Sequence, residues 1–327
     1  MKKSLIALAV LAASGASFAQ SSLNLYGIAD VYFGSVRATG TPTQTVLNSG
    51  GVSGSRFGLK GSEDLGGGLK ANFVFEQGFA IDTGATTAGQ AFSRQSYVGF
   101  SSHLGETKLG KMWTAYDDIS GAANDAFDSA LSAINNVWRS TGYTANPSNS
   151  AYYGSPNFSG FSGAISGSLG ENKTATVSPG GIVAFHVKYE GGPLYAGLGY
   201  QREKTNGTTN TVEFTRVNAT YDLGVAKLLA GYGRVQNVAA VSGNDTTEWQ
   251  IGVDFPVSKA LTVSGGLARS SDNAASGDAT RKGYSLAALY TLSKRTAMYG
   301  GYQSATQTMA GTDTDTSLLA VGVKHAF

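Results

Sequence analysis

Apolar and polar residues alternate in short segments along most of the chain between Ser22 and Phe327. In 22–36 one face carries Leu23, Leu25, Gly27, Ala29, Val31 and Phe33, and the other carries Asn24, Tyr26, Ile28, Asp30 and Tyr32. The segments 68–78 and 317–327 show the same period of two. Strict alternation over this length is typical of β-strands with one apolar and one polar face.

This pattern predicts sixteen strands, bounded by turn-forming Gly, Asn, Asp and Ser. They are expected at 22–36, 52–62, 68–78, 91–101, 105–112, 149–155, 161–169, 181–190, 193–203, 211–222, 225–236, 246–256, 260–270, 281–292, 296–305 and 317–327. Tight turns such as Gly191–Gly192 alternate with longer polar connections such as 38–51, 170–180 and 306–316. An even strand number with short and long links on opposite sides predicts an all-β fold, a 16-stranded antiparallel transmembrane β-barrel.

A soluble β-sandwich or propeller is the alternative fold. Sandwich strands rarely share one length, and the chain shows no blade repeat. Aromatic residues recur near the expected strand ends, for example at Tyr26, Tyr97, Phe100, Tyr200 and Tyr302. They suit the two interfacial girdles of a barrel, although β propensity alone also enriches them. The set as a whole favours the barrel.

The stretch from Trp113 to Pro147 breaks the alternation. It carries four acids and one base: Asp117, Asp118, Asp125, Asp128 and Arg139. Within it NDAFDSALSAINNVW places Phe127, Leu131 and Ile134 on one face, which indicates a single short helix with Asp125 or Asn124 as a candidate N-cap. An insert of this length in a compact β protein is usually functional. We expect residues 113–147 to fold into the barrel and narrow its pore.

The chain opens with MKKSLIALAVLAASGASFA, in which two lysines precede a short apolar run and a small-residue end. This order is typical of a secretory signal peptide over residues 1–19, which leaves 20–327 as the barrel domain. A membrane anchor is the alternative, but the apolar run is too short to span a bilayer as a helix. An exported barrel is expected in the outer membrane of a Gram-negative cell.

Charge and composition exclude several other functions. The chain has 24 Lys and Arg against 22 Asp and Glu, and the surplus of two equals Lys2 and Lys3 of the expected signal peptide. No field for nucleic acid follows from that balance. With no cysteine there is neither a disulfide nor a thiolate metal site, and the three histidines have no metal-ligand spacing. We therefore predict no cofactor, no metal and no nucleic-acid partner.

Five segments give the chain a family resemblance: LNLYGIADVYFGSV, SRFGLKGSEDLGGGLKANFVFEQGF, FSRQSYVGFSSHLGETKLGK, NSAYYGSPNFSGFSG and VGVKHAF. In this order they resemble the Gram-negative general porins, most closely those of the β-proteobacteria. The resemblance implies a homotrimer with a third loop folded into the pore and passive diffusion of ions and small hydrophilic solutes. It also implies that Phe327 is the signal read by the barrel-assembly machinery, and that outer-membrane lipid and lipopolysaccharide surround the barrel.

In that family arginines on the barrel wall face acids on the third loop. By motif the wall residues here are Arg56 and Arg94, and strand parity adds Lys60 to the same inward face. With the acids of the stretch and Arg139, they complete the candidate constriction. Two departures are visible. No arginine lies in Thr144–Ser148, where many relatives carry one, and AANDAFDSALS replaces the Pro-Glu-Phe-Gly turn.

Each wall cation could instead be a solvated charge without a role in permeation, and each acid could serve the loop alone. The wall cations suggest a weak preference for anions, which the loop acids could cancel. A substrate-selective channel is the alternative in the same class and would need a ladder of aromatic residues inside. An outer-membrane hydrolase would need a Ser, His or Asp constellation at one height, and an adhesin would need longer surface loops. Because none of these is evident, the sequence predicts a general diffusion pore rather than an enzyme.

Overall fold

The computed structural model describes residues 22–86, 89–207 and 211–327, so the expected signal peptide lies outside the described residues. The strands are β1 (Ser22–Ala38), β2 (Gln44–Ser49), β3 (Arg56–Gly66), β4 (Leu69–Gly78), β5 (Gln95–Ser102), β6 (Gly105–Lys111), β7 (Ser150–Gly154), β8 (Phe161–Leu169), β9 (Gly181–Gly191), β10 (Leu194–Lys204), β11 (Thr211–Asp222), β12 (Lys227–Gln236), β13 (Thr246–Pro256), β14 (Leu261–Asp272), β15 (Thr280–Thr291), β16 (Thr296–Met309) and β17 (Thr312–Ala326). The helical elements are α2 (Asp117–Ser120), η1 (Arg139–Gly142), η2 (Val238–Ala240) and η3 (Ala274–Ser276).

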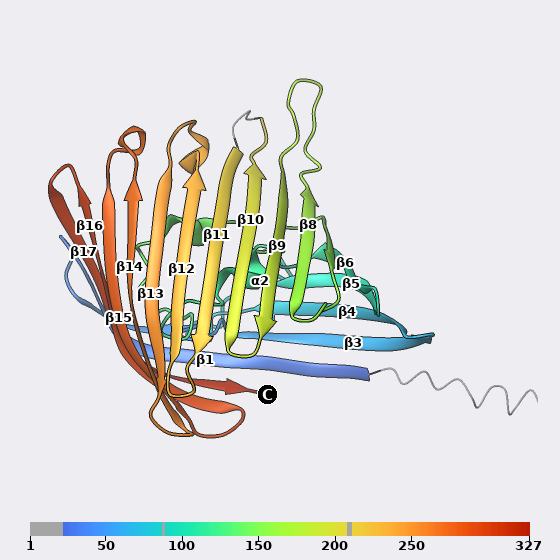
Figure 1. The fold of residues 1–327 in the computed structure, drawn as a ribbon, viewed down its shortest axis with the longest axis horizontal. Coiled ribbons are helices and arrows are strands. Elements are labelled where there is room, and N and C mark those ends of the chain that lie inside the picture. Colours follow the sequence, from blue (N-terminus) through green and yellow to red (C-terminus); the bar gives the residue numbers. More distant parts are fainter. Residues whose placement is uncertain (1–21, 87–88, 208–210) are drawn as a thin grey trace, which may run out of the picture.

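The strands form one closed antiparallel barrel, because β17 pairs with both β16 and β1. Two strands share one position in its wall. The end of β1 nearer the long loops pairs with β2, and the other end pairs with β3. The 17-stranded sheet therefore has sixteen positions, and the predicted 16-stranded barrel is confirmed. Figure 1 shows β8–β14 running between short turns at the bottom and longer loops at the top.

The shared position corrects two expected boundaries. Residues 44–49 were expected in the connection 38–51 but form β2, and the strand expected at 52–62 begins only at Arg56. The chain leaves the sheet between them, where Gly50 has a φ of 80°. The buried carboxylate of Asp30 then accepts the backbone N–H groups of Gly51 at 2.9 Å and Ser53 at 2.8 Å. The buried Asp30 carboxylate therefore stabilises the break between β2 and β3 through these hydrogen bonds.

The helix expected within 124–138 is wrong. The backbone there runs through successive turns, and Ala126, Phe127, Asp128 and Asn136 all have positive φ values. A right-handed helix cannot contain such residues. The last hairpin also differs from expectation, because β16 and β17 extend through most of 306–316. None of the helices in the described ranges is long and apolar enough to cross a membrane.

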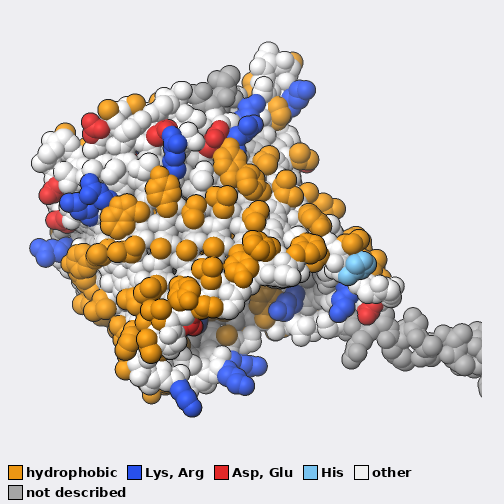
Figure 2. Space-filling model, in the orientation of Figure 1, with side chains coloured by type: hydrophobic (Ala, Val, Ile, Leu, Met, Phe, Trp, Pro, Cys, Tyr) orange, Lys and Arg blue, Asp and Glu red, His pale blue; other side chains and the backbone are white. Residues whose placement is uncertain are grey.

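The two faces of the wall differ in chemistry. Polar side chains such as Gln201, Arg216 and Gln250 are buried, whereas their neighbours such as Val217 and Ile251 are exposed. Exposed apolar side chains form a belt across the outside of the barrel in Figure 2. This arrangement reverses the distribution of a water-soluble protein and matches an apolar outer band around a polar interior.

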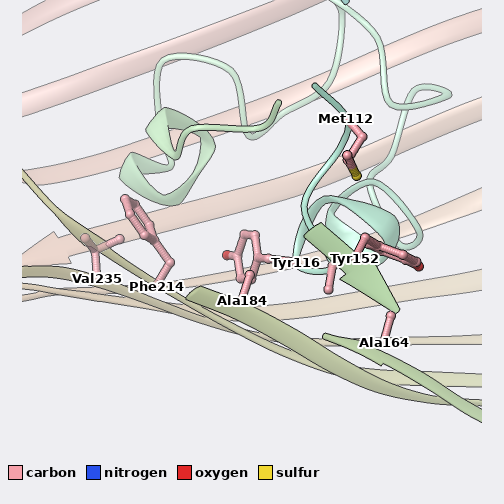
Figure 3. Packing of buried hydrophobic residues seen from close by; sticks show 8 residues of the cluster. Met112, Tyr116, Tyr152, Ala164, Ala184, Phe214 and Val235 are labelled. Carbon is pink, nitrogen blue, oxygen red and sulfur yellow. The ribbon is translucent and has the colours of Figure 1, made fainter. Parts of the chain in front are cut away.

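Among the described residues, the buried apolar clusters each include side chains of the β6–β7 connection or lie against it. In the largest patch Met112 and Tyr116 belong to one cluster with Tyr152 of β7, Phe214 of β11 and Val235 of β12 (Figure 3). Because Met112 and Tyr116 lie at the start of the connection, this patch fixes where it leaves β6.

Candidate pore constriction

Polar side chains of the wall hold the backbone of the β6–β7 connection. Amide and hydroxyl groups from β11, β13, β14 and β16 each donate to one of its carbonyls. The pairs are Asn218 to Ile119 at 2.5 Å, Gln250 to Ala123 at 2.6 Å, Ser270 to Val137 at 2.7 Å and Gln303 to Asn135 at 2.9 Å. The connection contains few residues in regular structure, so these bonds replace the partners that a helix or strand would supply.

Asp125 is an anchor of the connection. It is 1% exposed, and its carboxylate accepts the Ser132 hydroxyl at 2.7 Å and the Ala133 N–H at 3.1 Å. A hydroxyl on β15, that of Ser285, donates to its other oxygen. The absence of a side chain at Gly266 leaves space for Asp125, because a Cβ at position 266 would lie 2.7 Å from the Asp125 carboxyl carbon. Asp125 therefore does not join the acids that line an open space.

Arg139 is likewise an anchor, at the far end of the connection. Its guanidinium donates to Asp272 of β14 at 3.1 and 2.9 Å. The same carboxylate receives two bonds from Arg281 of β15, at 2.9 and 2.8 Å. The Asp272 side chain is fully buried, and paired bonds of this kind are strong and directional. The two arginines therefore fasten the end of the connection to two neighbouring strands.

The predicted wall arginines share one carboxylate, that of Glu76 on β4. Arg94 contacts it at 2.7 Å and Arg56 at 3.5 Å, while the Tyr26 hydroxyl donates to it at 3.0 Å. Glu76 is only 4% exposed, so its negative charge interacts with these three side chains rather than with solvent. The group retains one net positive charge on the wall.

Arg94 also extends into the first of two hollows beside the connection. Its guanidinium lies over the Trp113 ring at 4.9 Å, a cation–π distance. The hollow has a volume of about 770 Å³ and is lined by both residues, by Lys111 and by Asn146. The Lys111 ammonium donates to the Asn146 carbonyl at 2.7 Å. No carboxylate lines this hollow among the described residues, so its charged groups are basic.

The second hollow is acidic. It has a volume of about 610 Å³ and is lined by Asp117, Asp118, Asp128 and Tyr143, with Arg216 as its one lining cation among the described residues. Gly50, at the interruption between β2 and β3, lines both hollows. The basic and acidic surfaces therefore meet at the same point of the barrel.

Crowding by protein changes the ionisation of these acids. Burial raises the pKa of Asp117 to about 6, although the Tyr143 hydroxyl donates to it at 2.5 Å and opposes the shift. Burial also raises the pKa of Asp118, against the bond of 2.7 Å from the Tyr152 hydroxyl and the attraction of His186. Burial raises the pKa of Asp128 as well. The charge of the acidic surface therefore changes at a mildly acidic pH.

Lys60 lies apart from both hollows. Its ammonium is 4.9 Å from the centre of the Tyr26 ring, and it lines a third space of about 390 Å³ with Lys108 and Glu106. Lys108 is paired with Glu106 at 2.7 Å. The structure thus brings Arg56 and Arg94 together, gathers three of the acids elsewhere, and leaves Lys60 on a separate part of the wall.

Several residues of this site were missed by sequence reasoning. Strand parity could have placed Glu76, because it shares a face with Asn72 and Val74. Arg216 gives no such signal: it is 1% exposed, donates to Asn124 at 2.6 Å and lies over the Trp138 ring. Asp30 was assigned to the polar face without a role. Their partners are distant in sequence and depend on the register of the whole barrel.

Comparison with known proteins identifies the family. A family model described as Gram-negative porin matches residues 5–310. Outer membrane porin protein 32 of Delftia acidovorans is 36% identical, over 92% of this chain and 88% of that protein. An outer membrane porin protein of Bordetella pertussis is 27% identical over the whole of both chains.

A solved structure agrees with these matches. The anion-selective porin from Comamonas acidovorans superimposes with a TM-score of 0.81 at 28% identity, over 94% of this chain and all of that one. This chain forms a closed barrel with an apolar outer belt and a polar interior. This chain is an outer-membrane β-barrel pore, and it belongs to the Gram-negative porin family.

Proposed function

We propose that residues 113–147 form the constriction of a general diffusion pore, in which opposed charged surfaces act on passing ions and small hydrophilic solutes. The observation that carries this proposal is the meeting of the basic and acidic hollows at Gly50. No covalent step is involved. Solutes cross down their own concentration gradients through water.

The course of the connection supports this position. It is bonded to the polar faces of β11, β13, β14, β15 and β16. It also reaches the interruption between β2 and β3, where the Ala130 N–H donates to the Gly51 carbonyl at 2.7 Å. A segment lying outside the barrel could not bond to polar side chains of so many strands. A connection that is bonded to the polar faces of this many strands leaves less space for the pore.

The opposed charges are proposed to set a field across the constriction. Arg56 and Arg94 supply the basic side with Lys111, and Asp117, Asp118 and Asp128 supply the acidic side. Charge placed around a narrow aqueous path sets ion preference and orients dipolar solutes. Lys60 is proposed to add positive charge further along the wall. Asp125 and Arg139 serve the same constriction indirectly, by holding the connection in place.

We propose a weak preference for anions. Two arginines share one glutamate and Lys111 has no acid in its hollow, whereas burial favours the protonated form of the loop acids. The Comamonas protein is described as anion-selective. At neutral pH the three acids reduce the preference here without abolishing it.

Reversal potential in a planar bilayer under a KCl gradient tests this assignment. We expect stepwise openings whose reversal potential indicates weak anion selectivity. Replacing Arg56→Gln and Arg94→Gln together should move the permeability ratio toward cations by a few fold, since one charge at 4 Å in water is worth about 1 kcal/mol. The matched control is Arg295→Gln, in the exposed turn between β15 and β16. An unchanged ratio in the double variant would remove both arginines from the constriction, and a silent membrane containing inserted protein would contradict an open pore.

We also propose the partners that the family resemblance implies. The chain assembles as a homotrimer, contacts lipid and lipopolysaccharide, and is inserted by the barrel-assembly machinery through Phe327. The backbone of Phe327 exchanges two bonds of 3.0 Å with Gly27 of β1, and the residue as a whole is 48% exposed. The ring is therefore accessible where the barrel closes. Openings in groups of three would support the trimer.

A further inference from the structure

Two cations lie directly opposite each other on the outer face of the barrel. Arg269 of β14 is in register with Lys282 of β15. Both point outward, because their neighbours Ser270 and Arg281 are buried on the inner face. Like charges directly opposite across two strands destabilise a sheet. In the described ranges neither cation has an acid within ion-pair distance, so the structure leaves this repulsion without a protein partner.

Two other outward arginines near this end of the barrel have an acid in contact or in register. Arg234 of β12 contacts Asp245 at 2.8 Å. Arg202 of β10 is in register with Glu213 of β11. On the flanking strands the residues in register with Arg269 and Lys282 are Trp249 and Thr306, which carry no charge. The pair of cations sits close to the long loops, since β14 ends at Asp272 and β15 begins at Thr280.

An apolar groove, lined by residues of β12 to β15, begins directly below the pair. It has a volume of about 750 Å³ and is lined by Ile251, Val253, Gly265, Leu267 and Tyr284 among others. Leu267 and Tyr284 are each two residues from one of the cations, on the same outer face. Gly265 points outward without a side chain, so backbone forms the floor of the groove. Figure 2 shows apolar side chains across this outer surface, with Lys and Arg side chains toward its edge.

We propose that Arg269, Lys282 and this groove bind one phosphate-bearing lipid of the surrounding membrane. The phosphate lies between the two cations and relieves their repulsion through charge-assisted bonds. One acyl chain extends from it along the groove over Gly265. Trp249, which is in register with Arg269, flanks the headgroup at the height where amphipathic rings favour the interface. A free phosphate ion would satisfy the cations but leave the groove empty.

Fluorescence quenching by brominated lipid tests this site, because Trp249 is a natural reporter. Of the three tryptophans, Trp249 is 43% exposed on the outer face, whereas Trp138 is buried and Trp113 lines a hollow inside. The full barrel is refolded into phosphatidylcholine vesicles that contain dibrominated phosphatidylglycerol or dibrominated phosphatidylcholine. A Trp249→Phe variant supplies the background signal. Folding of every variant is checked by its heat-dependent migration on a gel.

The anionic lipid should quench Trp249 with an apparent affinity higher by roughly fivefold for each cation. Arg269→Gln with Lys282→Gln should abolish that preference. Arg234→Gln removes an equal charge from an acid-paired arginine and should leave the preference intact. Val253→Phe, beside Gly265, fills the groove and should weaken lipid binding although both cations remain.

Four results would overturn the proposal. The preference could persist in the Arg269/Lys282 double variant, or fall equally in Arg234→Gln, which would show general attraction to an anionic surface. Trp249 could also resist quenching by every lipid, which would mean that a second copy of the chain covers this face. An unchanged affinity in Val253→Phe would remove the acyl chain from the groove and leave a headgroup contact only.

Discussion

Arg56 and Arg94 show how the charge of a wall residue depends on partners that are far away in sequence. Parity correctly places Arg56 on the inner face, but the shared carboxylate of Glu76 emerges only when β3 and β4 are in register. The same applies to the acids. Asp117, Asp118 and Asp128 line one hollow. Asp125, which belongs to the same stretch of sequence, instead accepts hydrogen bonds from Ser132, Ala133 and Ser285. At this scale sequence identifies candidates but not their partners.

The ionisation of Asp117 makes a testable prediction. Because burial raises its pKa to about 6, the carboxylate is charged at pH 8 and mostly neutral at pH 5. Loss of this negative charge on acidification should raise the anion-to-cation permeability ratio by about twofold or more, by the same Coulomb estimate. Reversal potentials between pH 8 and pH 5 measure the effect. Asp117→Asn should have the higher ratio already at pH 8 and a smaller pH response, which Asp118 and Asp128 would supply. An equal response in wild type and variant would exclude Asp117 from the charged surface.

At the scale of elements, the strands were predictable and the connections were not. A period of two is a local signal, and it located every strand except β2. The interruption between β2 and β3 depends on Asp30, which is 21 residues from Gly51 in sequence. The expected helix failed for a related reason. Its apolar spacing is helical, but the wall of the barrel supplies bonds that stabilise turns with positive φ at Ala126 and Asn136.

Asp272 is predicted to be the anchor of the connection whose substitution lowers the free energy of unfolding most. Asp272→Asn removes the charge that pairs with Arg139 and Arg281, and the Arg281 side chain is only 6% exposed. Removing one partner of a buried ion pair costs roughly 3–5 kcal/mol. The free energy of unfolding, measured with urea in lipid vesicles, should fall by that order. The control is Asp245→Asn, which breaks the more exposed pair with Arg234 and should cost no more than about 1 kcal/mol. Equal losses in the two variants would contradict the anchoring role.

At the scale of the whole molecule, the closed barrel follows from the even strand count and from alternation on every strand. The alternation of apolar and polar residues does not predict the shape of the space inside the barrel. The connection that leaves β6 bonds to side chains of β11 and β16 and reaches the interruption at Gly51. Its course rests on hydrogen bonds such as those from Tyr152 to Asp118 and from Gln303 to Asn135, which join residues 34 and 168 positions apart. No local pattern encodes such bonds, so the pore is a property of the assembled barrel rather than of any one segment.

The most direct test is thiol modification of the connection during conductance recording. The chain has no cysteine, so Asp118→Cys introduces a single reactive group on the acidic surface, and Ala275→Cys in the β14–β15 loop is its control. A bulky cationic methanethiosulfonate reagent should reduce the single-channel conductance of Asp118→Cys and shift its reversal potential further toward anions. It should leave Ala275→Cys unchanged. If labelled Asp118→Cys conducts as before, residues 113–147 do not form the constriction, and the account of this pore is wrong.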